Sequence, residues 1–160
     1  LRVLLDVAKN FENISIFIAG KGLKLNKLKE YVSGKGYTNV EFYGEYKLEK
    51  LEELYSKIDI TYLIYPTIDS IVSLPNKFFE SIITETPIIA NEESEYGQIV
   101  KEEGLGWVID FDDLENGIRK ILQEINKNPH ALNYYRNNMR KVKNRYYWES
   151  NEEKLCEIYK

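Results

Sequence analysis

Residues 73–90 read Ser-Leu-Pro-Asn-Lys-Phe-Phe-Glu-Ser-Ile-Ile-Thr-Glu-Thr-Pro-Ile-Ile-Ala, a pattern of loop, helix, tight exit and buried strand. Proline fits the first turn of a helix, because its missing N–H would be unpaired there, so a helix is predicted to start at or near Pro75. Ser73 or Asn76 can cap the free N–H groups of that helix. The sequence Thr86-Pro87 then ends it before the strand.

The start of this helix has the chemistry of a phosphate site. Its N–H groups carry a partial positive charge, and Lys77 adds a full one. Glu80 follows Asn76 and Lys77 at i+4 and i+3, so the three share a face. A carboxylate there can accept two hydrogen bonds from neighbouring hydroxyls, such as those of a ribose. The alternative is a capped core helix whose apolar residues are buried and whose charged residues are solvated.

The composition indicates one globular domain of 160 residues, 43% of them apolar, so global disorder is not expected. The net charge of −4 does not suggest non-specific nucleic-acid binding, and no apolar run approaches the ~20 residues of a membrane span. A single cysteine, Cys156, excludes an internal disulfide framework and fits a reducing compartment. With one histidine, His130, the chain has neither a His/Cys metal cluster nor a Ser/His/Asp arrangement.

Short apolar runs alternate with helical patterns along the chain. Strands are expected at 14–19, 40–43, 58–65, 88–90 and 107–110, and further helices at 1–9, 25–32, 48–55, 94–103, 114–125 and 129–142. This alternation predicts a parallel sheet covered on both faces, in which ligands bind outside the carboxyl ends of the strands. Gly20 and Gly44 follow two of the strands, so they are expected on the same edge as the start of the helix at Pro75.

Both ends of the chain carry helical patterns. The chain opens at Leu1 without a capping signal, which indicates a piece of a longer protein entered part-way through a helix. Near the other end, one helix is expected to expose the basic residues Arg136, Arg140, Lys141, Lys143 and Arg145. That face is either merely solvated or able to bind anionic lipid head groups in a peripheral membrane association. Trp148 begins a last amphipathic segment.

Several short motifs follow one another in a known order. They are residues 16–22 and 42–44, each a strand followed by glycine, then 51–59, 74–90 and 99–108, and finally Tyr147-Trp148. In this order and spacing, the chain resembles the C-terminal domain of GT-B glycosyltransferases, in the retaining GT4-like group (glycosyl transferases group 1). The most specific of these motifs is residues 74–90.

The resemblance implies a Rossmann-like α/β fold, with a parallel sheet between two helical layers and a helical C-terminal tail. Residues 1–127 would be the donor-binding domain and residues 128–160 its helical extension. It also implies that the first strand, a basic segment that supplies an Arg and a Lys, and the acceptor-binding N-terminal domain precede Leu1. The chain alone would then bind the donor without turning it over.

The resemblance further implies a bacterial enzyme of polysaccharide biosynthesis, located in the cytoplasm or at the inner face of the membrane. It would transfer a hexose from a UDP- or GDP-sugar to a saccharide or lipid-linked acceptor without a metal or other cofactor, and would not bind nucleic acid. Glu80 would bond the ribose hydroxyls, while the segment Ser73, Leu74, Pro75, Asn76 and Lys77 would face the diphosphate. Gly44 to Tyr46 would lie by the base, and Gly20 would allow close approach to the donor.

One departure from the family pattern concerns the transferred sugar. Many members carry a second glutamate eight positions before the one that Glu80 matches, but Val72 stands here, with Asp69 as a substitute. The alternative hypothesis is a non-catalytic α/β interaction module in which the motif is structural. A hydrolase or epimerase of the same build would need additional acid/base residues that this chain does not show.

Overall fold

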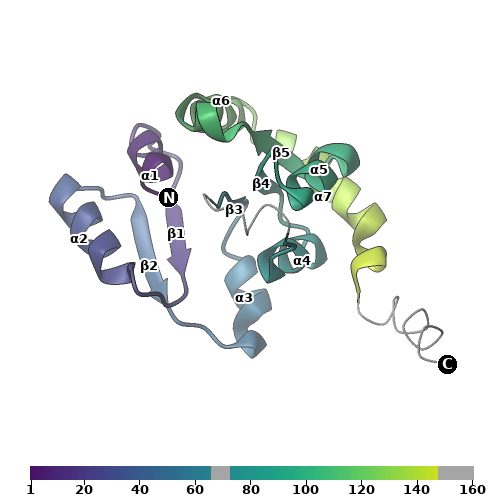
Figure 1. Ribbon diagram of the computed structural model, residues 1–160, viewed down its shortest axis with the longest axis horizontal. Coiled ribbons are helices and arrows are strands. Elements are labelled where there is room, and N and C mark those ends of the chain that lie inside the picture. Colours follow the sequence, from purple (N-terminus) through teal and green to yellow (C-terminus); the bar gives the residue numbers. More distant parts are fainter. Residues whose placement is uncertain (66–72, 148–160) are drawn as a thin grey trace.

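The computed structural model describes residues 1–65 and 73–147. Strand β1 (Ile16–Ala19) pairs with β2 (Val40–Gly44), and β4 (Ile88–Asn91) lies between β3 (Thr61–Leu63) and β5 (Gly106–Ile109). Each of these pairs is parallel, with Ile16 opposite Val40 and Thr61 opposite Ile88. The strands thus form a two-stranded and a three-stranded sheet, on the left and right of Figure 1.

Helices connect successive strands, as expected for parallel pairs. In chain order they are α1 (Arg2–Ala8), α2 (Leu25–Lys35), η1 (Leu48–Lys50), α3 (Leu51–Tyr55), α4 (Asn76–Ile83), α5 (Glu95–Glu103), η3 (Phe111–Asp113), α6 (Leu114–Lys127), α7 (Ala131–Val142) and η4 (Lys143–Tyr146). The predicted Rossmann-like α/β fold with a helical C-terminal end is confirmed.

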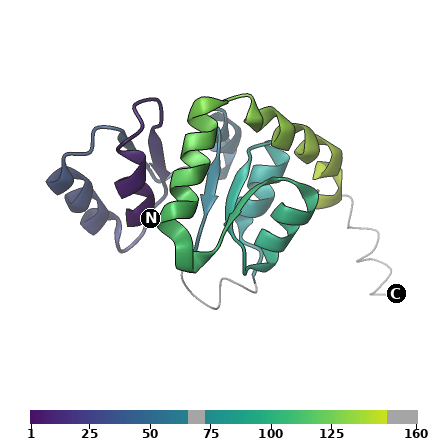
Figure 2. The ribbon, with the colours of Figure 1, turned by 90° about the horizontal axis from the view of Figure 1, so that it is seen from above.

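The central strand β4 shows why the sheet is covered on both faces. Its residue Ile89 belongs to a core cluster with Leu4 of α1 and Ile118 of α6. Its neighbours Ile88 and Ala90 belong to a second cluster, which includes residues of α4, α5 and α7. Because side chains alternate along a strand, a continuous apolar run fills both cores. Figure 2, seen from above, shows α6 along the face that α1 also covers.

Several boundaries differ from the predicted ones. The sequence predicts that Gly34 and Gly36 end the helix that begins at Leu25. Helix α2 instead runs through Gly34 to Lys35, and only Gly36, with a left-handed φ of 66°, ends it. The third strand is limited to Thr61–Leu63, although the apolar run is longer. The sequence pattern predicts that Leu48, Leu51, Leu54 and Tyr55 form the inner face of one helix. Leu48 is instead 75% exposed, because it lies in the 3₁₀ turn η1 rather than in α3.

Two further predictions concerned helix starts. The sequence predicts that Asp112 or Asp113 caps the helix that follows β5. Instead, the side chain of Asp110 accepts a hydrogen bond from the N–H of Asp112, and Asp113 makes no capping bond at the start of α6. A 3₁₀ turn therefore separates the cap from the helix. The helix expected from Pro129 begins at Ala131, after an exposed His130.

Helix α5 lies so close to β4 that a glycine is required between them. The Oγ of Ser94 accepts a hydrogen bond from the N–H of Gly97, which holds the first turn against the end of the strand. A Cβ on Gly97 would lie 1.7 Å from the carbonyl oxygen of Asn91, a backbone atom. A Cβ on Gly34 in α2, in contrast, would meet nothing within 4 Å.

A carboxylate joins the first two helices. Asp6 of α1 accepts hydrogen bonds from the hydroxyls of Tyr31, at 2.6 Å, and Tyr37. These two bonds lower the pKa of Asp6 below its usual value. The ionised form of Asp6 is therefore the one that holds α1 against α2.

The basic residues of α7 and η4 tie the C-terminal helix to three other parts of the chain. Glu85 follows α4 with a left-handed φ of 58°. Its carboxylate forms ion pairs with Nε of Arg140 at 2.5 Å and with Nζ of Lys143 at 2.6 Å. The other pairs join Arg136 to Asp59 before β3 and Arg145 to Glu103 at the end of α5. Four of the five basic residues expected to face solvent are thus paired with acids of the same chain, and binding to lipid head groups stays a prediction.

None of the helices within residues 1–65 and 73–147 combines the length and the apolar character needed to cross a bilayer. The predicted division into residues 1–127 and 128–160 stays a prediction, since the last thirteen residues, with Trp148 and Cys156, lie outside the described part of the chain.

Candidate functional site

Helix α4 begins where the sequence predicts, but its start is not capped as expected. Pro75 occupies the N-cap position with extended dihedrals (φ −71°, ψ 149°), and its carbonyl accepts the N–H of Phe78 at 2.8 Å. Ser73 therefore lies two residues too early to cap the helix, and Asn76 already belongs to its first turn. No capping side chain bonds this end of α4, so the prediction of a Ser73 or Asn76 cap is wrong.

Lys77 projects from this first turn toward the loop after β2. Its Nζ donates a hydrogen bond to the hydroxyl of Tyr46 at 3.1 Å and lies 5.5 Å from the centre of that ring. Among the described residues, no carboxylate lies within 4.0 Å of the ammonium group. The lysine is half-buried. A positive charge in this position is available to an anionic ligand, and Tyr46 fixes its direction.

Glu80 lies one turn further along the same face. Its Oε2 accepts a hydrogen bond of 3.0 Å from the hydroxyl of Tyr55, the last residue of α3, which is only 4% exposed. Burial is the main cause that raises the pKa of Tyr55, with the charge of Glu80 adding to it, so this hydroxyl stays protonated and donates. Within the described ranges, no hydrogen bond to Oε1 is found, which leaves that oxygen for a ligand.

A third tyrosine, Tyr65, lines the same cleft as Lys77. Burial is the main cause that raises the pKa of Tyr65, and the charges of Lys77 and Glu80 add smaller effects in opposite directions. Its backbone N–H is fixed by the side chain of Asn91 at 2.9 Å. We call Tyr46, Tyr55, Tyr65, Lys77 and Glu80 the rim cluster. Of its members, Tyr55, Tyr65 and Lys77 line a cleft of about 1210 Å³ that also reaches β1.

Three members of the rim cluster, Tyr46, Lys77 and Glu80, are predicted from the sequence, whereas Tyr55 and Tyr65 are not. Both were assigned to apolar helix and strand patterns, which their rings fit. The signal that could have identified them is chemical, because a buried tyrosine hydroxyl usually has a polar partner. A predicted core tyrosine beside a predicted binding carboxylate is therefore a candidate to hold that carboxylate.

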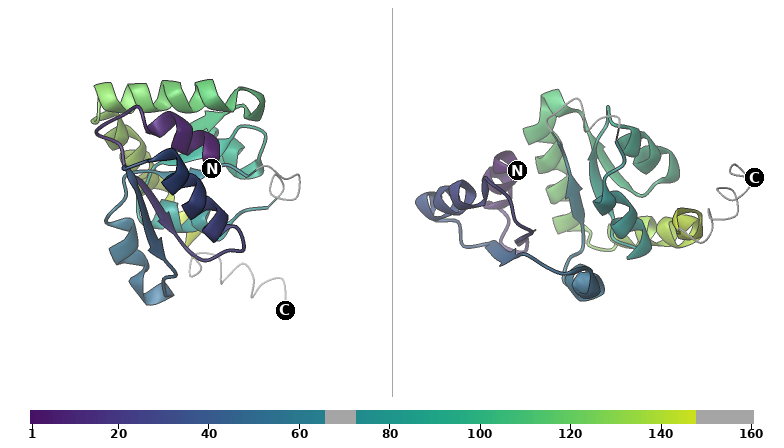
Figure 3. Two further views of the ribbon diagram at one scale, coloured as in Figure 1. Left: turned by 90° about the vertical axis from the view of Figure 1, so that its left-hand side faces the viewer. Right: turned by 60° about the horizontal axis from the view of Figure 1, so that its bottom comes forward.

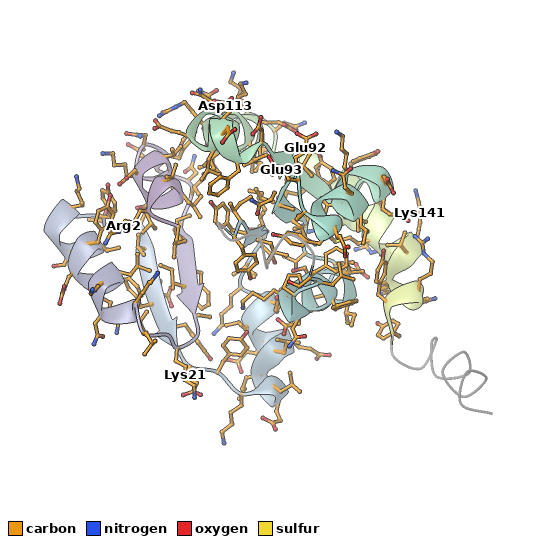
Figure 4. All side chains as sticks on the ribbon, in the orientation of Figure 1. Arg2, Lys21, Glu92, Glu93, Asp113 and Lys141 are labelled. Atoms are coloured by element: carbon orange, nitrogen blue, oxygen red, sulfur yellow. The ribbon has the colours of Figure 1, made fainter. Side chains whose placement is uncertain are left out.

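The two predicted glycines lie together at the ends of β1 and β2. The N–H of Gly20 donates to the carbonyl of Gly44 at 2.6 Å, and both have left-handed φ values, 123° and 86°. A Cβ at either would meet nothing within 4 Å, so their backbone conformation, rather than crowding, favours glycine. Beside them, Lys21 and Glu45 form an exposed ion pair, and Figure 4 shows Lys21 at the lower edge of the molecule.

The remaining predicted site residues stay predictions. Ser73, Leu74 and Asn76 are exposed at the start of α4 and take no part in the rim cluster. Asp69 and Val72 lie outside the described residues. The same described ranges hold no group of three or more His, Cys, Asp or Glu side chains that could bind a metal ion.

Comparison with models of protein families identifies a family for this chain. Residues 1–142 of the chain match the family model described as "Glycosyl transferases group 1". This match covers most of the 160 residues, including every residue of the rim cluster. No curated protein sequence is significantly similar to the chain.

Solved structures share the fold at low identity. Sucrose-phosphate synthase from Thermosynechococcus elongatus matches 98% of the chain with a TM-score of 0.79 and 17% identity. The Anabaena protein Alr3699/HepE, in complex with UDP and glucose, matches 99% with a TM-score of 0.79 and 12% identity. S. aureus TarM, as a G117R mutant in complex with fondaparinux, alpha-GlcNAc-glycerol and UDP, matches 99% with a TM-score of 0.72 and 17% identity. The chain spans 40%, 44% and 31% of these proteins, respectively.

Proposed function

Since the chain belongs to the glycosyl transferases group 1 family, we propose that it is the donor-binding part of a glycosyltransferase. The donor is a nucleoside diphosphate sugar, and the acceptor is a saccharide or a lipid-linked saccharide bound by another part of the protein. The observation that carries this proposal is the rim cluster. In it, Lys77, which has no carboxylate partner among the described residues, and Glu80, which Tyr55 holds by a hydrogen bond, share one face at the start of α4.

The diphosphate of the donor binds at the start of α4. The N–H groups of the first turn and the ammonium of Lys77 give this end a positive character. As the bond to the sugar breaks, negative charge grows on the leaving diphosphate, and these groups stabilise it because they are already oriented. Lys77 is held by Tyr46 at 3.1 Å, so little reorganisation is needed.

The ribose binds at Glu80. One carboxylate oxygen is taken by Tyr55, so the other is directed toward the ligand and accepts from the ribose hydroxyls. This is a positioning role rather than proton transfer, and it orients the sugar carrier for the reaction. Tyr46 lies beside the base. Retention of configuration, transfer of a hexose and independence from metal ions belong to the same proposal.

The similarity in fold to proteins solved with UDP supports a UDP-sugar as the donor. Two proteins that share the fold, Alr3699/HepE and TarM, were solved with UDP, and the first also with glucose. Synthesis of a polysaccharide in the cytoplasm, or at the inner face of a membrane, is the setting we propose for such an enzyme.

Isothermal titration calorimetry with UDP and with GDP tests the proposal. We expect the chain to bind one of the two nucleotides, and Glu80→Ala to weaken that binding by a factor of about 10 to 100, the range for losing hydrogen bonds to a charged group. Glu80→Gln, which keeps an acceptor for Tyr55, controls for folding. The matched control is Glu102→Ala, which removes an exposed carboxylate of α5 and should leave the affinity unchanged.

Equal binding of the nucleotide by the chain and by Glu80→Ala would contradict the role of Glu80. Binding of neither UDP nor GDP by the folded chain would contradict the proposal as a whole. A second arm uses uridine in place of UDP, because Lys77→Ala should weaken UDP binding and leave uridine binding unchanged.

A further inference from the structure

The 3₁₀ turn η4 packs against the start of α4. The ring of Tyr146 lies edge-on to the ring of Phe78, with centroids 5.7 Å apart and planes at 82°, and it is tilted against Phe79 at 6.3 Å. Phe78 is fully buried, and Tyr146 and Phe79 pack around the same core cluster. Figures 1 and 3 show the yellow end of the α7–η4 segment beside α4. Because aromatic pairs prefer particular angles, these contacts fix the place of α4 relative to η4.

The two phenylalanines lie on the side of α4 that is opposite to its charged side. Each residue of an α-helix turns by about 100°, so positions 77 and 80 are centred on one side and positions 78 and 79 on the other. All four residues lie within the first five of the helix. A displacement of this turn toward or away from Tyr146 therefore displaces Lys77 and Glu80 with it.

A second contact fastens η4 to the other end of α4. Nζ of Lys143 lies 2.6 Å from the carboxylate of Glu85, which follows the helix. Since Lys143 opens η4 and Tyr146 closes it, η4 runs along α4 in the opposite direction and contacts both of its ends. The guanidinium of Arg145 lies 6.0 Å from the centre of the Tyr146 ring and pairs with Glu103 of α5. The turn is thus itself held in place from α5.

The contacts on the charged side of α4 are of a different kind. They are hydrogen bonds of side chains, from Lys77 to Tyr46 at 3.1 Å and from Tyr55 to Glu80 at 3.0 Å. Hydrogen bonds weaken steeply as their angle departs from the preferred one. The strength of the bond between Tyr55 and Glu80 therefore reports where the first turn of α4 lies.

We propose that Tyr146 is a positioning residue of the candidate site, which sets the place of Lys77 and Glu80 through α4 without touching a ligand. The ring of Tyr146, rather than its hydroxyl, makes the contacts with Phe78 and Phe79, so the ring is the part that acts. The consequence for nucleotide binding rests on the proposed function, whereas the positioning itself does not.

Urea unfolding without any ligand tests the positioning. In the unmodified chain, Tyr55→Phe should lower the urea midpoint because it removes the hydrogen bond to Glu80. In the background of Tyr146→Leu, which removes the aromatic ring, that shift should fall to roughly half or less, because the displaced carboxylate no longer meets the hydroxyl. Tyr146→Phe keeps the ring and should preserve the full shift.

The matched control is Ile118→Val. This change removes one methyl group from a fully buried residue in the core on the other face of the sheet. It should lower the stability of the chain and leave the shift caused by Tyr55→Phe unchanged, because it does not touch α4.

A second arm measures nucleotide affinity by calorimetry, with UDP, or with GDP if the chain binds that nucleotide instead. Tyr146→Leu should weaken binding about tenfold, since a displacement of about 1 Å of a positioned group can cost as much as 100-fold. Tyr146→Phe and Ile118→Val should bind like the unmodified chain. In the background of Glu80→Ala the effect of Tyr146→Leu should shrink, because the group that it positions is gone.

The other outcomes overturn the proposal. Equal shifts from Tyr55→Phe with and without the Tyr146 ring mean that the ring does not place Glu80, and so does a shift that is lost in Tyr146→Phe. A loss of affinity that Ile118→Val shares means that general stability is the cause. If the unmodified chain binds neither nucleotide, the proposed function fails, and the urea measurement alone decides on Tyr146. If Tyr146→Leu does not fold, Tyr146→Met takes its place in both arms.

Discussion

Replacing Tyr55 by phenylalanine tests whether the rim cluster holds Glu80 as the structure indicates. The change removes one hydroxyl and keeps the buried ring. A hydrogen bond to a charged group contributes about 1.5–3 kcal/mol, and water can replace part of it because Glu80 is only half-buried. We therefore expect the free energy of unfolding to fall by about 1–2 kcal/mol, which lowers the Tm by about 3–6 °C in a protein of this size.

Tyr62→Phe is the matched control. The hydroxyl of Tyr62 is also buried, but it has no hydrogen-bond partner among the described residues. An unpaired buried hydroxyl costs about 1–3 kcal/mol, so its removal should leave the free energy of unfolding unchanged or raise it. The same substitution is thus expected to lower the free energy of unfolding at position 55 but not at position 62, measured by urea unfolding followed by circular dichroism.

A double-mutant cycle isolates the bond between Tyr55 and Glu80. In the background of Glu80→Ala, Tyr55→Phe should cost nothing, which gives a coupling energy of about 1–2 kcal/mol. The reasoning is refuted if Tyr55→Phe costs the same with and without the carboxylate, or if it behaves like Tyr62→Phe. A further readout is UDP affinity, which should fall in Tyr55→Phe because Glu80 loses its fixed direction.

The remaining predictions concern stability. Gly97→Ala should lower the free energy of unfolding by about 3 kcal/mol, because the new Cβ would clash with the backbone of Asn91. Gly34→Ala, where the Cβ meets nothing, should raise it by about 0.5 kcal/mol. Equal shifts of the two urea midpoints would contradict this. Because the pKa of Asp6 is lowered in the folded protein, its ionised form stabilises the fold above about pH 4, and this stabilisation is lost as the pH falls through the pKa of the folded state. In guanidinium unfolding, the difference in the free energy of unfolding between the unmodified chain and Asp6→Asn should therefore shrink between pH 7 and pH 3. Glu85→Gln should cost about 0.5–1.5 kcal/mol at low salt and less in 1 M NaCl, and an unchanged difference would argue against the ion pairs.

Local sequence signals predicted the elements that depend on neighbouring residues. Pro75 and Gly36 stand at a helix start and a helix end, and the apolar run at residues 88–90 is a strand buried on both faces. The alternation of strands and helices was enough for the parallel α/β fold. Lys77 and Glu80 were assigned to one site from the helix start and their spacing, and the family resemblance added Tyr46. The structure places the three around the start of α4.

The missed features depend on residues far apart in the chain. Tyr55 meets Glu80 from 25 positions away, and Arg136 meets Asp59 from 77 positions away, so no local pattern reveals either pair. The shortened third strand has the same cause. A run of β-formers becomes a strand only where a neighbouring strand pairs with it, and only Thr61–Leu63 has such a partner in β4. The expected cap at Ser73 failed because Pro75 already takes the position.

The ion pairs of α7 also bear on how this chain is made. A ribosome releases residues in order, and the turn at Glu85 receives Arg140 and Lys143 from 55 and 58 positions later. While those residues are still inside the exit tunnel, the turn that follows α4 stands without its two cations. Premature termination shortly after residue 127 would therefore leave β1 to β5 without the ion pairs of α7, so proteases should cut a nascent protein of that length more readily.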